Sequence, residues 1–142
     1  DLLPVLKLKG DAAAGQVIYT QRCALCHRAG KAGHVLGPDL VSVKANGPEK
    51  LLASIVDPNR EVAANYVAYD VALRDGGTQT GLIGDETLTH VRIKLPLGKE
   101  LLLPRTQVKG MRSGGKSIMP EGLEAGLSPQ QMADLLAFIA GL

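Results

Sequence analysis

Two cysteines and a histidine lie together in the segment Cys23-Ala24-Leu25-Cys26-His27. Two thiols three residues apart at the end of a helix can reach two vinyl groups on one edge of a porphyrin. The adjacent imidazole can then bind the iron, and tethering makes that ligation nearly intramolecular. This spacing is the pattern of c-type haem attachment. It predicts one covalent haem, carried by Cys23 and Cys26, with His27 as an axial ligand of its iron.

Two other chemistries use paired cysteines and stay open as lesser alternatives. A zinc site needs four ligands, usually from two such pairs, but the chain has only two cysteines. His34 falls in a glycine-rich loop and His90 on a predicted strand, so neither is an obvious further ligand. A thioredoxin-like dithiol follows a strand of a parallel sheet, whereas a helix is predicted before Cys23. The pattern therefore favours haem over metal or dithiol chemistry.

A second axial ligand is expected among the three methionines, because thioether ligation is typical of electron carriers and raises the reduction potential. Met132 lies on the apolar face of a predicted helix and is expected in the core. Met111 and Met119 both fall in the predicted loop before that helix. We favour Met119, because Pro120 restricts its backbone to extended conformations and so helps to aim the side chain. Met111 remains an alternative. His34 is the main candidate other than methionine, but it follows His27 by only seven residues and is expected to be an exposed loop histidine.

Three helices must position these residues. Asp11 is a plausible N-cap for a helix that reaches to about residue 24. A second helix begins at Gly47-Pro48-Glu49 and is stopped by Pro58. The third begins at Ser128-Pro129-Gln130-Gln131, with a serine N-cap and proline in the first turn. The stretches 27–47 and 106–127 are rich in glycine or proline and are predicted to be loops.

Residues 66–105 change to a period of two, with turns at Asp75-Gly76-Gly77 and Gly84-Asp85-Glu86. This pattern predicts a small antiparallel meander, and Pro104 is expected at its end or edge. Its four strands are predicted over 67–74, 78–83, 87–95 and 100–103.

Composition sets the remaining limits. The chain has 142 residues, which suits one domain, and 45% of them are apolar. A net charge of +2 is too small to favour nucleic acid, and no apolar run approaches the roughly 18 residues of a membrane span. The chain opens Asp1-Leu2-Leu3-Pro4 without the features of a signal peptide. We read this start as a cut, and residues 1–10 as a linker.

With these residues in place, the chain resembles the class I cytochrome c family. In that family the first and last helices cross closely, with a glycine at the crossing and aromatic residues beside it. The matching positions here are Gly15, Tyr19, Leu135 and Phe138. The resemblance implies a mainly α fold: a class I cytochrome c helical fold around one haem, over residues 11–142, with the β-meander of 66–105 inserted.

Two further segments match that family. In Gly37-Pro38-Asp39-Leu40 the resemblance implies that the Pro38 carbonyl accepts a hydrogen bond from Nδ1–H of His27, and that Leu40 packs on the porphyrin. The segment Ser117-Ile118-Met119-Pro120 resembles the loop that carries the distal ligand. The cofactor-binding residues implied are thus Cys23, Cys26, His27, Pro38, Leu40 and Met119, with His27 and Met119 on the metal.

The inserted meander departs from the plain family and resembles the haem-binding domain type of Planctomycetes and Verrucomicrobia (the Pirellula/Verrucomicrobium type). The segments that carry this likeness are 23–27, Asp57-Pro58-Asn59, 66–77 and 117–123. Such domains sit in larger exported proteins beside dehydrogenase or repeat domains. The resemblance therefore implies a periplasmic or otherwise exported module. Its partners would be redox proteins or a fused dehydrogenase domain. The meander could cover a haem edge or dock a partner.

Three functions are compatible with these features. Iron with two protein ligands has no open site, so the chain is expected to transfer electrons and not to act as an enzyme. A haem enzyme or gas sensor needs an open or displaceable sixth position, to which Arg112 or Lys116 could lie close. A purely structural haem is the least favoured, because covalent attachment consumes export and maturation machinery.

Overall fold

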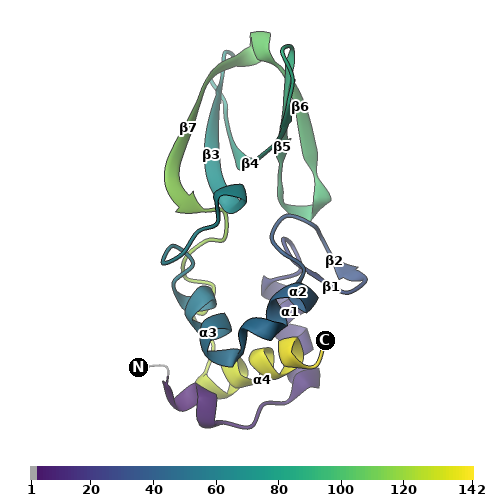
Figure 1. Ribbon diagram of the computed structural model, residues 1–142, viewed down its shortest axis with the longest axis vertical. Helices are drawn as coiled ribbons and strands as arrows, with labels where there is room; N and C mark the ends of the chain where they lie inside the picture. The colour runs from purple at the N-terminus through teal and green to yellow at the C-terminus, as the bar shows by residue number, and fades with distance from the viewer. Residues whose placement is uncertain (1–2) are drawn as a thin grey trace.

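The computed structural model describes residues 3–142, so Asp1 and Leu2 of the predicted linker lie outside the described part. A group of helices forms one end of the molecule and a five-stranded sheet forms the other (Figure 1). The described residues contain four α-helices and two antiparallel sheets, with 37% helix and 29% strand. The predicted mainly α fold class is therefore wrong, because the sheet is larger than the sequence pattern indicated.

The three predicted helices form where their capping residues place them. The side chain of Asp11 accepts hydrogen bonds from the N–H groups of Ala13 and Ala14. Ser128 and Gln131 form a reciprocal capping box at the start of the last helix. The α-helices are α1 (Ala12–Arg22), α2 (Leu40–Val43), α3 (Pro48–Val56) and α4 (Pro129–Ala140). The 3₁₀ helices are η1 (Leu3–Lys7), η2 (Lys44–Asn46), η3 (Ala64–Tyr66), η4 (Pro96–Gly98) and η5 (Arg105–Gln107).

The predicted meander is confirmed, and one more strand follows it. Its strands are β3 (Val67–Leu73), β4 (Thr78–Glu86), β5 (His90–Lys94) and β6 (Glu100–Pro104). The chain then crosses to the opposite edge and forms β7 (Val108–Ser117) against β3, so the order is β6-β5-β4-β3-β7.

The prediction of a loop over 106–127 is wrong where β7 forms. The sequence did not reveal this strand for a physical reason. This strand lies at the sheet edge, and its residues 109–116 are all exposed, so it carries no alternation of buried and exposed side chains. The loop predicted over 27–47 is also wrong in part. It contains α2, η2 and a two-stranded ribbon, β1 (Arg28–Ala29) with β2 (Ala32–Gly33).

The first and last helices cross as the family resemblance implied. A Cβ on Gly15 would collide with the backbone carbonyl of Asp134, so only glycine allows this approach of α1 to α4. Beside the crossing, the rings of Tyr19 and Phe138 lie 5.2 Å apart between centroids at an interplanar angle of 36°. This tilted arrangement is favourable for an aromatic pair.

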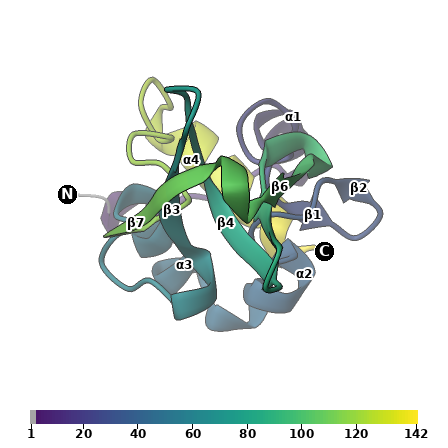
Figure 2. The ribbon, with the colours of Figure 1, turned by 90° about the horizontal axis from the view of Figure 1, so that it is seen from above.

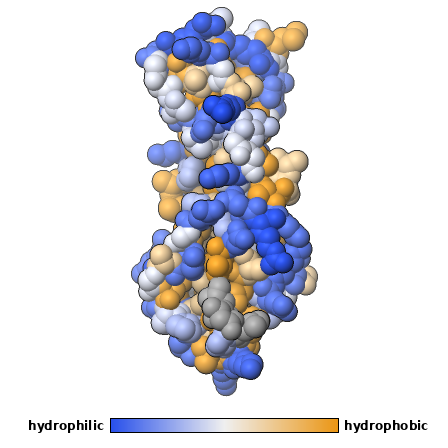
Figure 3. Space-filling model, turned by 90° about the vertical axis from the view of Figure 1, so that its left-hand side faces the viewer, coloured by the Kyte–Doolittle hydropathy of each residue, from blue (hydrophilic) through white to orange (hydrophobic). Residues whose placement is uncertain are grey.

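The helices and the sheet have separate hydrophobic interiors. The helical core contains Val5 of η1 together with Ile18, Tyr19, Leu40, Leu51, Leu52, Met132, Ala133, Leu135, Leu136 and Ile139. The sheet buries its own group, with Val71, Val91 and Ile93 fully inaccessible and Leu82 nearly so. Seen from the side, the molecule accordingly has two rounded parts joined by a narrower waist (Figure 3).

The turn of the β5–β6 hairpin joins the two parts. The N–H of Leu97 in η4 donates a 2.8 Å hydrogen bond to the carbonyl of Leu25, between the two cysteines. Leu97 has a φ of 64°, the left-handed region that leucine rarely adopts. A cavity of about 370 Å³ lies beside this contact, lined by residues of both parts. His34, predicted to be exposed, is half-buried at its wall.

Candidate haem-attachment site

The two cysteines and the histidine follow directly from α1. Cys23 is its C-cap, with its N–H bonded to the Tyr19 carbonyl at 2.8 Å. The N–H groups of Cys26 and His27 both bond to the Cys23 carbonyl, at 3.1 and 2.9 Å. One tight turn therefore brings two thiols and an imidazole together at the helix end.

Tyr19 fixes the backbone of His27. Its hydroxyl donates a 2.8 Å hydrogen bond to the His27 carbonyl and lies 3.2 Å from the carbonyl of Ala32. Burial raises the pKa of Tyr19, so the phenol keeps its proton and remains a donor. Gly33 has a φ of 87°, and a Cβ there would collide with both the Tyr19 hydroxyl and the His27 carbonyl. This glycine is required for the arrangement.

The imidazole of His27 is oriented by its neighbours in the following loop. Nδ1 lies 2.7 Å from the carbonyl oxygen of Pro38, the hydrogen bond expected from the resemblance. Because a carbonyl can only accept, this contact assigns the proton to Nδ1 and leaves the Nε2 lone pair free. Burial lowers the pKa of His27, and the bond to Pro38 acts in the opposite direction. A Cβ on Gly37 would lie 2.5 Å from ring atom Cε1, so the loop packs directly against the ring.

The state of the cysteines helps to distinguish the possible chemistries. They form no disulfide with each other. Burial raises the pKa of Cys23 to about 11 and raises that of Cys26 as well, so both stay protonated at neutral pH. Zinc ligands and reactive dithiols need thiolates stabilised by their surroundings. Moreover, residues 3–142 contain no group of three or more His, Cys, Asp or Glu that could hold a metal ion.

Leu40 and the methionines occupy different environments. Leu40 begins α2 and is buried in the helical core, against which Cys23 also packs. Met119 follows β7 and is half-buried, with its N–H 3.1 Å from the Ser117 hydroxyl oxygen. Met111 lies within β7 opposite Val71 and is 37% exposed, while Met132 is buried in the helical core as predicted.

The segment after β7, which carries Met119, lies on the opposite side of the molecule from β1 and β2 in both Figure 1 and Figure 2. The ribbon β1–β2 directly follows His27 in the chain. The structure therefore brings Pro38 to His27, and the segment after β7 lies away from the ribbon that follows His27.

Sequence reasoning missed three side chains or contacts that hold this region. They are the amide of Asn59, the guanidinium of Arg22 and the bond between Leu97 and Leu25. Asn59 belongs to a segment that carried the sub-family likeness, which was the one available signal. Nothing in the sequence indicated the partners of the other two.

The family model for cytochrome c matches residues 12–92, more than half of the chain. The chain belongs to the cytochrome c family. This assignment gives it haem with its iron and a role in haem-based electron transfer. No curated protein matches the chain. Among residues 3–142, no helix has the length and apolar character needed to cross a membrane.

The residues present fit a haem. Two cysteines outside any disulfide and one imidazole with its Nε2 lone pair free suit thioether formation and iron ligation. The iron of a bound haem exchanges one electron with a partner. This chain's own part would be to hold the ring, to fix the plane of the His27 imidazole and to raise its basicity through Pro38.

Proposed function

We propose that this chain is a single-haem electron carrier, bound covalently through Cys23 and Cys26 and ligated by His27 and Met119. The observation that carries the proposal is the 2.7 Å contact from His27 Nδ1 to the Pro38 carbonyl. It selects the tautomer that leaves Nε2 for iron and fixes the ring orientation, which a merely packed histidine would not need. Leu40, which is buried in the helical core, would pack on the porphyrin.

Elimination among the methionines supports Met119 as the sixth ligand. The side chain of Met132 is committed to the helical core, and Met111 sits at an exposed position on an edge strand of the sheet. Met119 is in a half-buried segment between the sheet and α4. A protein thioether would close the iron to substrates, as electron transfer without catalysis requires. Soft sulfur and a buried ring would both favour the ferrous state.

The proposal also treats residues 11–142 as one cytochrome c domain of the Pirellula/Verrucomicrobium type, with the sheet inserted. We infer a periplasmic or otherwise exported setting and a role as a module of a larger redox protein. Electrons would pass to redox partner proteins or a fused dehydrogenase domain. The contact of Leu97 with Leu25 supports a role for the sheet in covering the attachment segment.

Two measurements test the proposal. Acid–organic extraction of the purified protein should leave the haem colour with the chain, and clean extraction would refute covalent attachment. Met119→Ala should make the ferrous protein bind carbon monoxide readily and should lower its reduction potential. Met111→Ala is the matched control and should change neither. Rapid carbon monoxide binding by the unaltered ferrous protein would overturn the carrier assignment in favour of a sensor or enzyme.

A further inference from the structure

The side chain of Asn59 bonds to the chain on both sides of Met119. Its carbonyl oxygen Oδ1 accepts a 2.8 Å hydrogen bond from the N–H of Ser117. Its amide nitrogen Nδ2 donates a 2.7 Å bond to Oε1 of Glu121. Ser117 and Glu121 lie two residues before and two residues after Met119, so one side chain spans the segment that carries the thioether.

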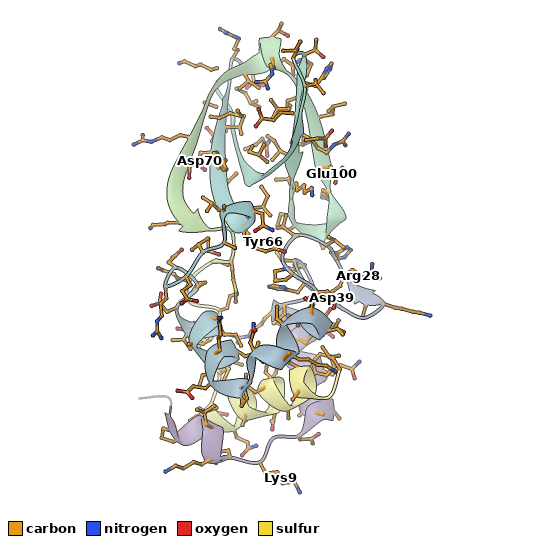
Figure 4. All side chains as sticks on the ribbon, viewed as in Figure 1. Lys9, Arg28, Asp39, Tyr66, Asp70 and Glu100 are labelled. Carbon is orange, nitrogen blue, oxygen red and sulfur yellow. The ribbon has the colours of Figure 1, made fainter. Side chains whose placement is uncertain are left out.

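Further hydrogen bonds hold the backbone just before and shortly after Met119. The N–H of Ile118 bonds to the carbonyl of Tyr66 at 2.9 Å, and Tyr66 lies at the end of the sheet nearest the helices (Figure 4). Downstream, Nη1 of Arg22 donates to the carbonyls of Leu123 and Ala125, both at 2.7 Å. Arg22 immediately precedes Cys23, so the segment is anchored to the helix that ends in the attachment motif.

We propose that Asn59 is a positioning residue: it presets the conformation of residues 117–121, the Met119 segment, so that the thioether can bind the iron. The inference rests on the proposed function, because it assumes that Met119 binds the iron. A loop that is ordered before ligation loses less entropy when its sulfur binds, so the ligand competes better with an external one. Only a side chain that both accepts and donates can make this pair of bonds, and an amide does so without charge.

The chemistry of Asn59 suggests variants that separate its two bonds. Asn59→Ala removes both. Asn59→Asp keeps an acceptor for Ser117 but loses the donor and places a carboxylate beside Glu121. Adding Glu121→Gln to Asn59→Asp supplies a donor from the other side, so the second bond can re-form in reverse. Thr80→Val is the control, because it removes an exposed side-chain bond to Asp70 within the sheet.

The experiment measures carbon monoxide affinity of the ferrous haem protein, together with the ferric absorption band that reports sulfur–iron ligation. Circular dichroism monitors the fold. Asn59→Ala should raise the affinity about tenfold, as expected for the loss of two modest hydrogen bonds, and should weaken the band without changing the dichroism. Asn59→Asp should also raise the affinity. The double variant should return it toward the parent value, and Thr80→Val should leave it unchanged.

The outcomes keep the two proposals distinct. If Met119→Ala opens the iron but Asn59→Ala leaves affinity and band at the parent values, the positioning role is wrong and the ligand assignment stands. If Met119→Ala has no effect, the ligand assignment itself fails. Should Asn59→Ala not fold, Glu121→Ala removes one bond from an exposed position and should raise the affinity about threefold. An unchanged affinity in that variant would then overturn the inference.

Discussion

The crossing of α1 with α4 and the edge strand β7 differ in how closely the chain is packed around them. In the helical part, glycines allow backbone and ring atoms to approach so closely that a single added carbon would collide, as at Gly15 and Gly37. In the sheet, a Cβ on Gly81 would also collide with a backbone carbonyl, that of Lys94, whereas the edge strand β7 is largely exposed. Close packing is therefore found at the helix crossing, against the His27 ring and between β4 and β5, whereas β7 leaves room for added side chains.

The largest effect should come from adding a side chain at the helix crossing. Gly15→Val would drive its Cβ into the Asp134 carbonyl, a backbone atom that cannot move cheaply. We expect a loss of about 3 kcal/mol or more in the free energy of unfolding, measured by urea titration. Gly110→Val is the matched control in the sheet, because a Cβ there meets nothing within 4 Å. It should change stability by less than about 0.5 kcal/mol. Equal losses would remove the contrast between the helix crossing and the edge strand.

A second substitution tests whether the sheet has an independent core. Ile93 is fully inaccessible in β5, so Ile93→Ala should cost about 3 kcal/mol through lost burial and a residual cavity. Hydrogen exchange should accelerate in β4, β5 and β6, while the visible spectrum of the haem protein stays that of the parent. Leu88→Ala serves as the control, since Leu88 is 97% exposed. A changed spectrum together with faster exchange in α1 and α4 would show that the two interiors act as one.

The same contrast explains what the sequence could predict. Asp11, Pro48 and Ser128 are local capping signals, and the structure confirms all three helix starts. The alternation in 66–105 likewise predicted the meander, and it matches burial most closely in β5, where buried residues alternate with half-buried ones. In contrast, β7 has no buried face, and its place beside β3 depends on pairing that periodicity does not encode. This missing strand contributed to the mistaken mainly α prediction.

The contacts of the candidate site also divide into those that the sequence predicted and those that it did not. The contact of His27 with Pro38 spans 11 positions and came with a recognisable family segment. The bond from Ser117 to Asn59 joins residues 58 positions apart, and the bond from Leu97 to Leu25 joins the two parts of the molecule. Such contacts are set by how the sheet sits on the helical part. A single sequence gives residue types and local periods, but not the partner of a lone amide.

A third prediction concerns the contact between the two parts. Leu97 adopts a φ of 64°, which costs a residue with a Cβ about 1–2 kcal/mol but costs glycine far less. Leu97→Gly should therefore be more stable than Leu97→Ala by about 1 kcal/mol, measured as the difference in free energy of unfolding. Both variants lose the same half-exposed side chain and keep the N–H that bonds to Leu25, so the comparison isolates the backbone. If the alanine variant is the more stable, the left-handed turn is not a source of strain.

The smallest expected effect lies on the surface of the sheet and depends on pH. Nε of Arg92 donates a 2.8 Å bond to Asp85, while Nη1 bonds to Glu100 at 3.0 Å. The hydrogen bond from Arg92 lowers the pKa of Asp85 below its ordinary value. A carboxyl group whose pKa is lower in the folded chain stabilises the fold while it is ionised in both states. That contribution disappears as the pH falls through the pKa of the folded state.

Asp85→Asn should therefore lower the melting temperature slightly at pH 7, and the difference from the parent should vanish toward about pH 2. Because the pair is exposed, the difference at pH 7 should also shrink in high salt. The haem spectrum should not respond at either pH, since the ion pair belongs to the sheet. A difference that persists at pH 2 would mean that Asp85 acts through packing and not through its charge.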